Sequence, residues 1–265
     1  MGFLGFGNYS KPGKGVNKDE PQKKRFFYFF ELYFRKFWGL IKLNLLFVLT
    51  SLPIVTIGAS LSAMSYILRN YNDEKPIFLW ADYMKSFKQN FKVSTIVWLI
   101  DVVLIFLLVQ SYFFYSAAVE TSWFYYIPLA FIMFFGIVVI FSNFYIYLLI
   151  ASVNLKLKGL IKNAVYLSFL GVKTNVITLI IFSAFAIAIF YFGVLFLPFL
   201  PFALVLLPVF STIGFIIVYN SFQYIYKFIA KPYYEETGEK DPYIKEENTQ
   251  DLIFDDDVKS HNMDE

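Results

Sequence analysis

The fold is decided by one stretch of sequence, residues 35–71, which reads RKFWGLIKLNLLFVLTSLPIVTIGASLSAMSYILRNY. Residues 43–68 within it contain no Asp, Glu, Lys or Arg. A helix needs about 20 apolar residues to cross a bilayer, so this stretch is long enough to enter a membrane. The number of times it crosses fixes the side of the membrane on which every later loop lies.

Three further runs of the chain carry no charged residue, namely 102–119, 121–155 and 174–226. The 265 residues are 58% hydrophobic and 22% aromatic, and only 16% are charged, whereas about 25% are charged in an average soluble domain. The runs are apolar throughout, without the alternating polarity of a membrane β-barrel. The sequence therefore predicts an all-α, polytopic bundle of transmembrane helices.

Basic residues set the expected topology, because Lys and Arg are enriched in cytoplasmic loops. Nine lie at or before Lys42, five in residues 69–92, four in residues 152–173, and five after residue 226. If residues 35–71 crossed once, strongly basic regions would lie on opposite sides of the membrane. If they cross twice, every basic region is cytoplasmic. We therefore expect about six crossings arranged as hairpins, with five as the alternative if this stretch is one long helix kinked at a proline. The six expected crossings are about 35–52, 54–71, 93–118, 124–151, 174–197 and 199–226.

Pro53 marks the expected hairpin turn, because proline lacks a backbone donor and disfavours a helical residue before it. The second arm is rich in small residues, beginning with Gly58. Such residues let helices approach closely in lipid. We expect Pro53 to form the turn and Gly58 to belong to a buried packing face.

Two amphipathic segments are expected to lie in the cytoplasmic interface. Residues 77–92 place Trp80, Phe87 and other aromatic side chains at helical spacing, with lysines on the remaining face. Residues 155–173 form the second segment.

The two ends of the chain differ from its middle. Residues 1–25 are predicted to be a flexible cytoplasmic segment, and residues 26–230 the transmembrane helical domain. Residues 231–265 hold 12 of the 20 acidic and 4 of the 23 basic residues, so residues 1–230 carry a net charge of +11. We expect this acidic tail to be disordered, with both termini cytoplasmic in a multi-pass protein of the cell membrane.

One acidic residue, Asp101, is expected inside a crossing, where a charge costs about 2.5–3.5 kcal/mol on insertion scales. Lys42, Asn44, Asn143 and Asn220 fall in the same half of the membrane under the predicted boundaries. Two interpretations remain open. These residues line a cavity for a polar solute or a proton, or Asp101 pairs with Lys42 or the asparagines and fixes helix packing.

Several function classes find no support in the sequence. The chain has no Cys and one His, His261, so it lacks thiolate chemistry and His-based metal sites. No phosphate loop, nucleophile elbow or carboxylate pair is present, and the basic residues lie at expected membrane edges. We expect no catalytic residues, cofactor, metal or nucleic-acid partner, and the lipid bilayer as the main surrounding.

The stretch FFYFFELYFRKFWGLIKLNLLFVLTSLPIVTIGASLSAMSYILRNY (26–71) and the basic FKQNFK that follows resemble the YesL-like family of uncharacterised bacterial integral membrane proteins of Firmicutes. That resemblance is strongest over residues 26–92 and supplies no catalytic residues. It implies a non-enzymatic accessory or scaffold protein associated with carbohydrate uptake, with sugar ABC transporter permease subunits as expected partners. A small-solute transporter or lipid-handling protein is the alternative. The oligomeric state is not predicted.

Overall fold

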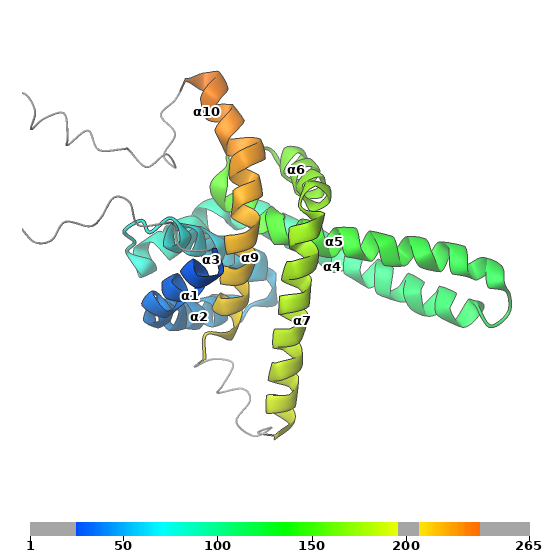
Figure 1. Ribbon diagram of the computed structural model, residues 1–265. Helices are drawn as coiled ribbons and strands as arrows, with labels where there is room; N and C mark the ends of the chain where they lie inside the picture. The colour runs from blue at the N-terminus through cyan, green and yellow to red at the C-terminus, as the bar shows by residue number, and fades with distance from the viewer. Residues whose placement is uncertain (1–24, 196–206, 239–265) are drawn as a thin grey trace, which may run out of the picture. The chain divides into compact units, whose positions relative to one another are not determined.

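The computed structural model describes residues 25–195 and 207–238, and within these ranges the chain is helical with no strand, as predicted (Figure 1). The predictions for residues 1–24 and 239–265, and for the turn near residue 198, lie outside the described residues. Three short elements, Ile54–Thr56, Trp123–Tyr125 and the π-helix Tyr226–Ala230, adjoin the longer helices. The longer helices are α1 (Arg25–Arg35), α2 (Phe37–Ser51), α3 (Ile57–Asn72), α4 (Leu79–Ala118), α5 (Tyr126–Ser152), α6 (Leu157–Leu170), α7 (Val172–Leu195), α9 (Val209–Ile225) and α10 (Lys231–Thr237).

Helix α1 belongs to a separate compact unit that ends at Arg35. Its aromatic rings pack against one another along the helix, and the ring centroids of Phe26 and Phe30 are 4.9 Å apart in an edge-on arrangement. This spacing follows from the positions i and i+4, which lie on one helix face.

The chain folds back at Pro53, so residues 35–71 contain two antiparallel helices and not one kinked helix. Helix α2 ends just before Pro53, and Thr56 closes the turn by donating its hydroxyl to the Thr50 carbonyl oxygen at 2.6 Å. At the other end of the pair, Tyr71 in α3 packs on Gly39 in α2. A Cβ at Gly39 would lie 3.0 Å from the ring Cζ of Tyr71.

Helix α3 is the centre of the second unit, and 12 of its 16 residues are buried. It packs against α2, α4, α5 and α9. The two helices approach closely at Gly58, where an added Cβ would come within 2.7 Å of the Trp98 Cβ on α4 and still closer to the Ser94 carbonyl oxygen. Only glycine fits there, because any side chain would push the two helices apart.

Helix α4 corrects the expectation of an interfacial helix over 77–92 followed by a separate crossing from residue 93. It is one continuous helix of 40 residues. No Gly or Pro occurs between Leu79 and Ala118 to interrupt it. At 1.5 Å per residue it is about 60 Å long, roughly twice the thickness of a hydrocarbon core.

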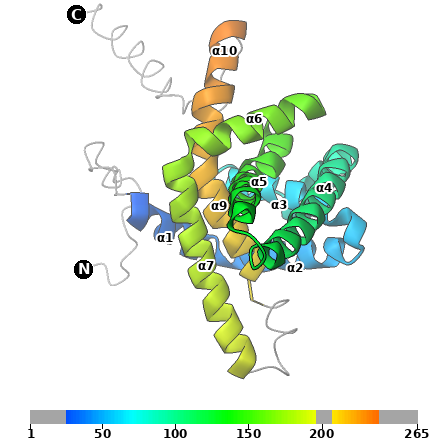
Figure 2. The ribbon, with the colours of Figure 1, turned by 90° about the vertical axis from the view of Figure 1, so that its right-hand side faces the viewer.

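The outer parts of α4 and α5 project from the helix bundle as a long hairpin (Figures 1 and 2). None of residues 102–140 is buried, whereas Asp101 and Phe141 are. The exposed side chains are large and apolar, for example Phe114 at 67% and Phe131 at 62% exposure. The hairpin therefore leaves the bundle at the level of Asp101.

The remaining helices complete the bundle around α3. Helix α6 packs on α5 and meets α7 near Gly171 at a bend of 88°. Helix α9 is antiparallel to α7, and both views show α7 running across the direction of the α4–α5 hairpin (Figures 1 and 2). Helices α7 and α9, which belong to the expected crossings 174–197 and 199–226, are therefore not aligned with the α4–α5 hairpin, which belongs to the expected crossings 93–118 and 124–151.

By length and composition, two helices of the described chain can cross a membrane, Leu79–Ala118 and Trp123–Ser152. A third becomes possible if α6 and α7 are counted together as one bent span. These apolar helices support a membrane protein. Six crossings are not confirmed.

Candidate functional site

The candidate site lies at the base of the α4–α5 hairpin, where Asp101 is the last buried residue of α4. Asn143 and Tyr147 are four residues apart on α5, so both face the same neighbour. That neighbour is Asp101 on α4, to which both side chains form hydrogen bonds. The three side chains form the Asp101 cluster.

Each carboxylate oxygen of Asp101 accepts one hydrogen bond from α5. The Tyr147 hydroxyl donates to Oδ2 at 2.9 Å, and the Asn143 side-chain amide donates to Oδ1 at 3.3 Å. The same amide nitrogen also donates to the Val139 carbonyl oxygen at 3.1 Å. Asp101 is 9% exposed, and no ion pair to it occurs among the residues that the structure describes. Both carboxylate oxygens of Asp101 therefore have a hydrogen-bond partner inside the protein. The cluster links α4 to α5 at the point where the two helices leave the bundle.

Three residues that were expected beside Asp101 do not contact it in the structure, namely Lys42, Asn44 and Asn220. The Lys42 side chain is exposed on α2. Asn220 donates to the Thr178 hydroxyl at 3.0 Å and so joins α9 to α7. The structure therefore brings together Asp101 and Asn143 and separates the other three residues from them.

Asn44 holds the beginning of α9. Its side-chain oxygen accepts hydrogen bonds from the backbone N–H groups of Phe210 at 3.0 Å and Ser211 at 3.4 Å. These amides belong to the first turn of a helix, where no carbonyl of the same helix is available. A second bond joins the same two helices, because the Ser211 hydroxyl on α9 donates to the Leu40 carbonyl oxygen on α2 at 2.8 Å. Asn44 thus acts as a helix cap supplied by a distant segment.

A cavity of about 130 Å³ lies between α2, α3, α5 and α9. Asn143 and Tyr147 are on its wall, but Asp101 is not. The other lining residues are apolar except Ser65. The wall is therefore mainly apolar, and its polar side chains are those of Ser65, Asn143 and Tyr147.

Tyr147 was missed by the sequence reasoning, although its spacing of four residues from Asn143 could have indicated it. Arg69 was also missed, because it was counted only as a basic residue of a cytoplasmic loop. It is 8% exposed at the end of α3.

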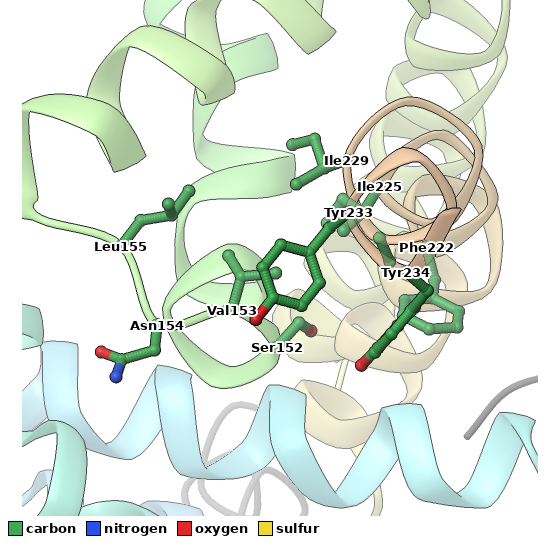
Figure 3. Close-up of a pocket in the computed structure, with 10 residues that line it drawn as sticks. Ser152, Val153, Asn154, Leu155, Phe222, Ile225, Ile229, Tyr233 and Tyr234 are labelled. Atoms are coloured by element: carbon green, nitrogen blue, oxygen red, sulfur yellow. The ribbon is translucent and has the colours of Figure 1, made fainter. Parts of the chain in front are cut away.

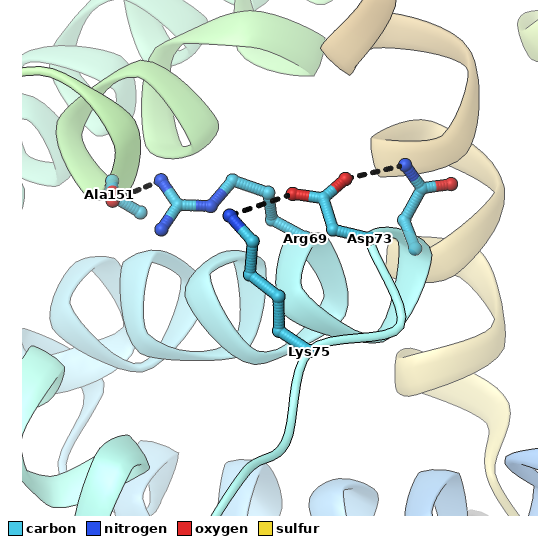
Figure 4. Close-up of polar contacts among 5 residues, drawn as sticks. Arg69, Asp73, Lys75 and Ala151 are labelled. Atoms are coloured by element: carbon cyan, nitrogen blue, oxygen red, sulfur yellow. Dashed lines mark hydrogen bonds and ion pairs between the residues drawn. The ribbon is translucent and has the colours of Figure 1, made fainter. Parts of the chain in front are cut away.

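Arg69 joins the ends of two helices (Figure 4). Its Nη1 donates to the Ala151 carbonyl oxygen near the end of α5 at 2.9 Å. The guanidinium also lies over the Tyr66 ring, 5.0 Å from its centroid. Carbonyl groups in the last turn of a helix carry partial negative charge, which a cation stabilises.

Asp73 lies beside Arg69 in the loop after α3 and forms an ion pair of 3.7 Å with Lys75. Burial raises the pKa of the Asp73 carboxyl above its usual range, and the charges of Lys75 and Arg69 offset part of that rise. The loop therefore holds a partly desolvated acid between two cations.

No group of three or more His, Cys, Asp or Glu residues suited to a metal ion occurs in residues 25–195 and 207–238. Pro53 and Gly58 contribute to the turn and to the α3–α4 contact, as described above, and not to a pocket around Asp101.

Residues 40–112 match the model of the family described as "Protein of unknown function, DUF624". The matched region begins within α2 and includes α3 and most of α4, that is, the fold-back at Pro53 and one arm of the hairpin. No curated protein and no solved structure matches the chain. The match supports an uncharacterised family and assigns no activity.

Proposed function

We propose that this chain is a non-enzymatic accessory or scaffold protein of the cell membrane, anchored by the α4–α5 hairpin. The observation that carries the proposal is the exposed apolar surface of residues 102–140. From Asp101 to the end of α4 the helix is about 26 Å long, close to the hydrocarbon thickness of about 30 Å. At the hairpin tip, Trp123 and Tyr125 are exposed and suit the far membrane interface.

The proposed membrane boundary lies near Asp101. Lys85, Lys88 and Lys92 on the inner half of α4 are exposed, and charged side chains are costly in hydrocarbon. Helix α3 packs beside this inner half, so the proposal places α3 on the cytoplasmic side as well. The basic regions 69–92 and 152–173 then share the cytoplasmic side, as charge counting requires, because two crossings satisfy the rule as well as six.

The beginning of α4 provides a candidate partner surface. Phe78 is 82% and Trp80 61% exposed, and the exposed lysines follow along the same helix. Exposed aromatic side chains beside cations are typical of binding surfaces. The YesL-like resemblance suggests sugar ABC transporter permease subunits as the partner and carbohydrate uptake as the process.

Affinity purification of the full-length chain from native membranes tests this proposal. Permease subunits should be recovered with the wild-type chain, and Trp80→Ala should weaken their recovery by about tenfold, as expected for loss of a buried aromatic anchor. Trp123→Ala is the matched control, because Trp123 is similarly exposed at the opposite end of the hairpin. Equal recovery with Trp80→Ala would argue against this surface, and absence of permease subunits from the wild-type sample would argue against the proposed partner.

A small-solute transporter or lipid-handling protein is the second candidate. It is favoured by the position of Asn143 and Tyr147, which contact Asp101 and also line the cavity between α2, α3, α5 and α9. Purified protein in liposomes should then move solute or lipid without any partner. Movement by the chain alone would favour this candidate over the scaffold.

A further inference from the structure

A second cavity, of about 300 Å³, lies apart from the Asp101 cluster, at the end of α5 (Figure 3). One wall is the α5–α6 connection. The other is formed by the end of α9, the π-helix and α10. Its lining residues are Ser152, Val153, Asn154, Leu155, Phe222, Ile225, Ile229, Ala230, Tyr233 and Tyr234. Small-molecule sites in proteins begin at about this volume.

The wall contains a buried polar atom without a partner. The Oγ of Ser152 is inaccessible to solvent and makes no hydrogen bond among the described residues. A buried hydroxyl without a partner costs about 1–3 kcal/mol, so such atoms are uncommon unless something else satisfies them. Rotation of the Ser152 side chain about χ1 would turn this hydroxyl toward the cavity, where a ligand with one donor or acceptor group would satisfy it.

The opposite wall has unusual backbone geometry. Tyr226–Ala230 form a π-helix, and Ile229 and Ala230 from this segment line the cavity. π-Helical turns are rare and occur frequently at functional sites. Figure 3 shows the Tyr233 ring between the two walls, with its hydroxyl directed toward Val153.

The chemistry of the lining restricts the ligand. None of the ten lining residues is charged. A charged ligand would lose hydration without gaining an ionic partner, which is unfavourable. Phe222, Ile225 and Ile229 supply apolar surface, and two tyrosines supply flat rings.

We propose that this cavity is a binding site for an uncharged small molecule with an apolar or ring-shaped body and a hydroxyl group that bonds to Ser152. The site is independent of the proposed scaffold function, since it shares no residue with the Asp101 cluster or with the beginning of α4.

The absence of Cys from the chain permits a direct test, because an introduced cysteine is the only thiol. Ala230→Cys in the full-length protein places a thiol on the cavity wall, and its labelling rate with N-ethylmaleimide is measured in nanodiscs. Three probes of similar size and different charge are added in turn: benzyl alcohol, benzoate and benzylammonium. Benzyl alcohol should slow labelling about fivefold at a concentration four times its Kd, and the two charged probes should have little effect.

Two variants make the result specific. Ala81→Cys, exposed on α4 and on the wall of neither this cavity nor the one beside it, should be labelled at the same rate with and without benzyl alcohol. Ser152→Ala in the Ala230→Cys background should make benzyl alcohol no better a protector than toluene, which lacks the hydroxyl. If Ala230→Cys does not fold, Ile229→Cys replaces it.

Equal protection by all three probes, equal slowing at Ala81→Cys, or no protection at either cavity cysteine would overturn the proposal. Protection by benzyl alcohol that survives Ser152→Ala unchanged would overturn the assigned hydroxyl contact.

Discussion

Arg69 and Ala151 are 82 residues apart in the chain, yet the Arg69 guanidinium donates a hydrogen bond of 2.9 Å to the Ala151 carbonyl oxygen (Figure 4). This bond ties the end of α3, the most buried helix of the bundle, to the end of α5, one arm of the hairpin. It therefore connects the bundle to the proposed membrane anchor.

Arg69→Met is expected to lower the free energy of unfolding by about 2 kcal/mol, because the Ala151 carbonyl loses a charged donor and Asp73 loses a neighbouring cation. Unfolding in mixed detergent micelles measures this loss. Lys75→Met is the control, since the Lys75 side chain is 35% exposed and its ion pair should contribute less than about 1 kcal/mol. Equal losses of unfolding free energy from the two substitutions would show that the Arg69–Ala151 bond stabilises the fold no more than the exposed ion pair does.

Gly58→Ala should destabilise the fold by about 1–3 kcal/mol, because the new methyl group would overlap Ser94 and Trp98 on α4. Gly136→Ala is a matched control. Gly136 has no atom within 4 Å of an added Cβ, and alanine is the better helix former by up to about 1 kcal/mol. Thermal unfolding in detergent should show a lower Tm for the first variant and an equal or higher Tm for the second. A Tm for Gly58→Ala equal to that of the wild type would contradict the close α3–α4 contact.

Local features of the sequence were the most predictable part of this fold. Pro53 indicates the fold-back without any knowledge of distant contacts, and the small residues that begin with Gly58 indicate a packed face. The partners of polar residues were harder to predict. Asp101 was expected to need a partner, but the choice among Lys42 and three asparagines depends on how helices pack, which residue spacing does not define.

The number of crossings could not be deduced from charge for a related reason. Counting Lys and Arg determines which loops share a side of the membrane, so it distinguishes an odd from an even number of crossings between them. It cannot separate a spanning hairpin from one that lies wholly on the cytoplasmic side. Asn44 was grouped with Asp101 because the predicted boundaries placed both in the same half of the membrane, but Asn44 caps α9 through amides 166 and 167 residues away.

The stability of the loop after α3 should depend on pH through Asp73. Burial raises its pKa in the folded state above the unfolded value of about 3.9, so protonation favours the fold. This contribution is fully present below the unfolded pKa and is lost as pH rises through the folded pKa. Asp73→Asn does not titrate, so the Tm of this variant relative to the wild type should be more favourable at neutral pH than at about pH 4. A relative Tm that moves in the opposite direction would indicate that Lys75 and Arg69 outweigh the burial of the carboxyl.

The side of the membrane that holds the α2–α3 turn distinguishes the proposed topology from six crossings. Ile54 is 72% exposed at this turn, and Trp123 is 67% exposed at the hairpin tip. In intact cells, a membrane-impermeant maleimide should label Trp123→Cys from outside and should label Ile54→Cys only after the cells are opened. External labelling of both cysteines would support the six-crossing topology, in which one crossing lies on each side of Pro53.

Asp101 is expected to stabilise the base of the hairpin and not to carry a solute or a proton. Asp101→Asn places an amide donor opposite either Tyr147 or Asn143, which should cost about 1–2 kcal/mol, and Tyr147→Phe should cost about 1 kcal/mol. Because the two residues share one hydrogen bond, their double variant should lose less than the sum of the single variants, by roughly 0.5–1 kcal/mol. Unfolding of all four proteins in mixed micelles gives this coupling. Solute flux in liposomes is the second measurement, and it should be the same for folded Asp101→Asn and wild type. A change in flux without a change in stability would assign Asp101 to transport, because a packing role cannot alter flux while leaving the fold equally stable.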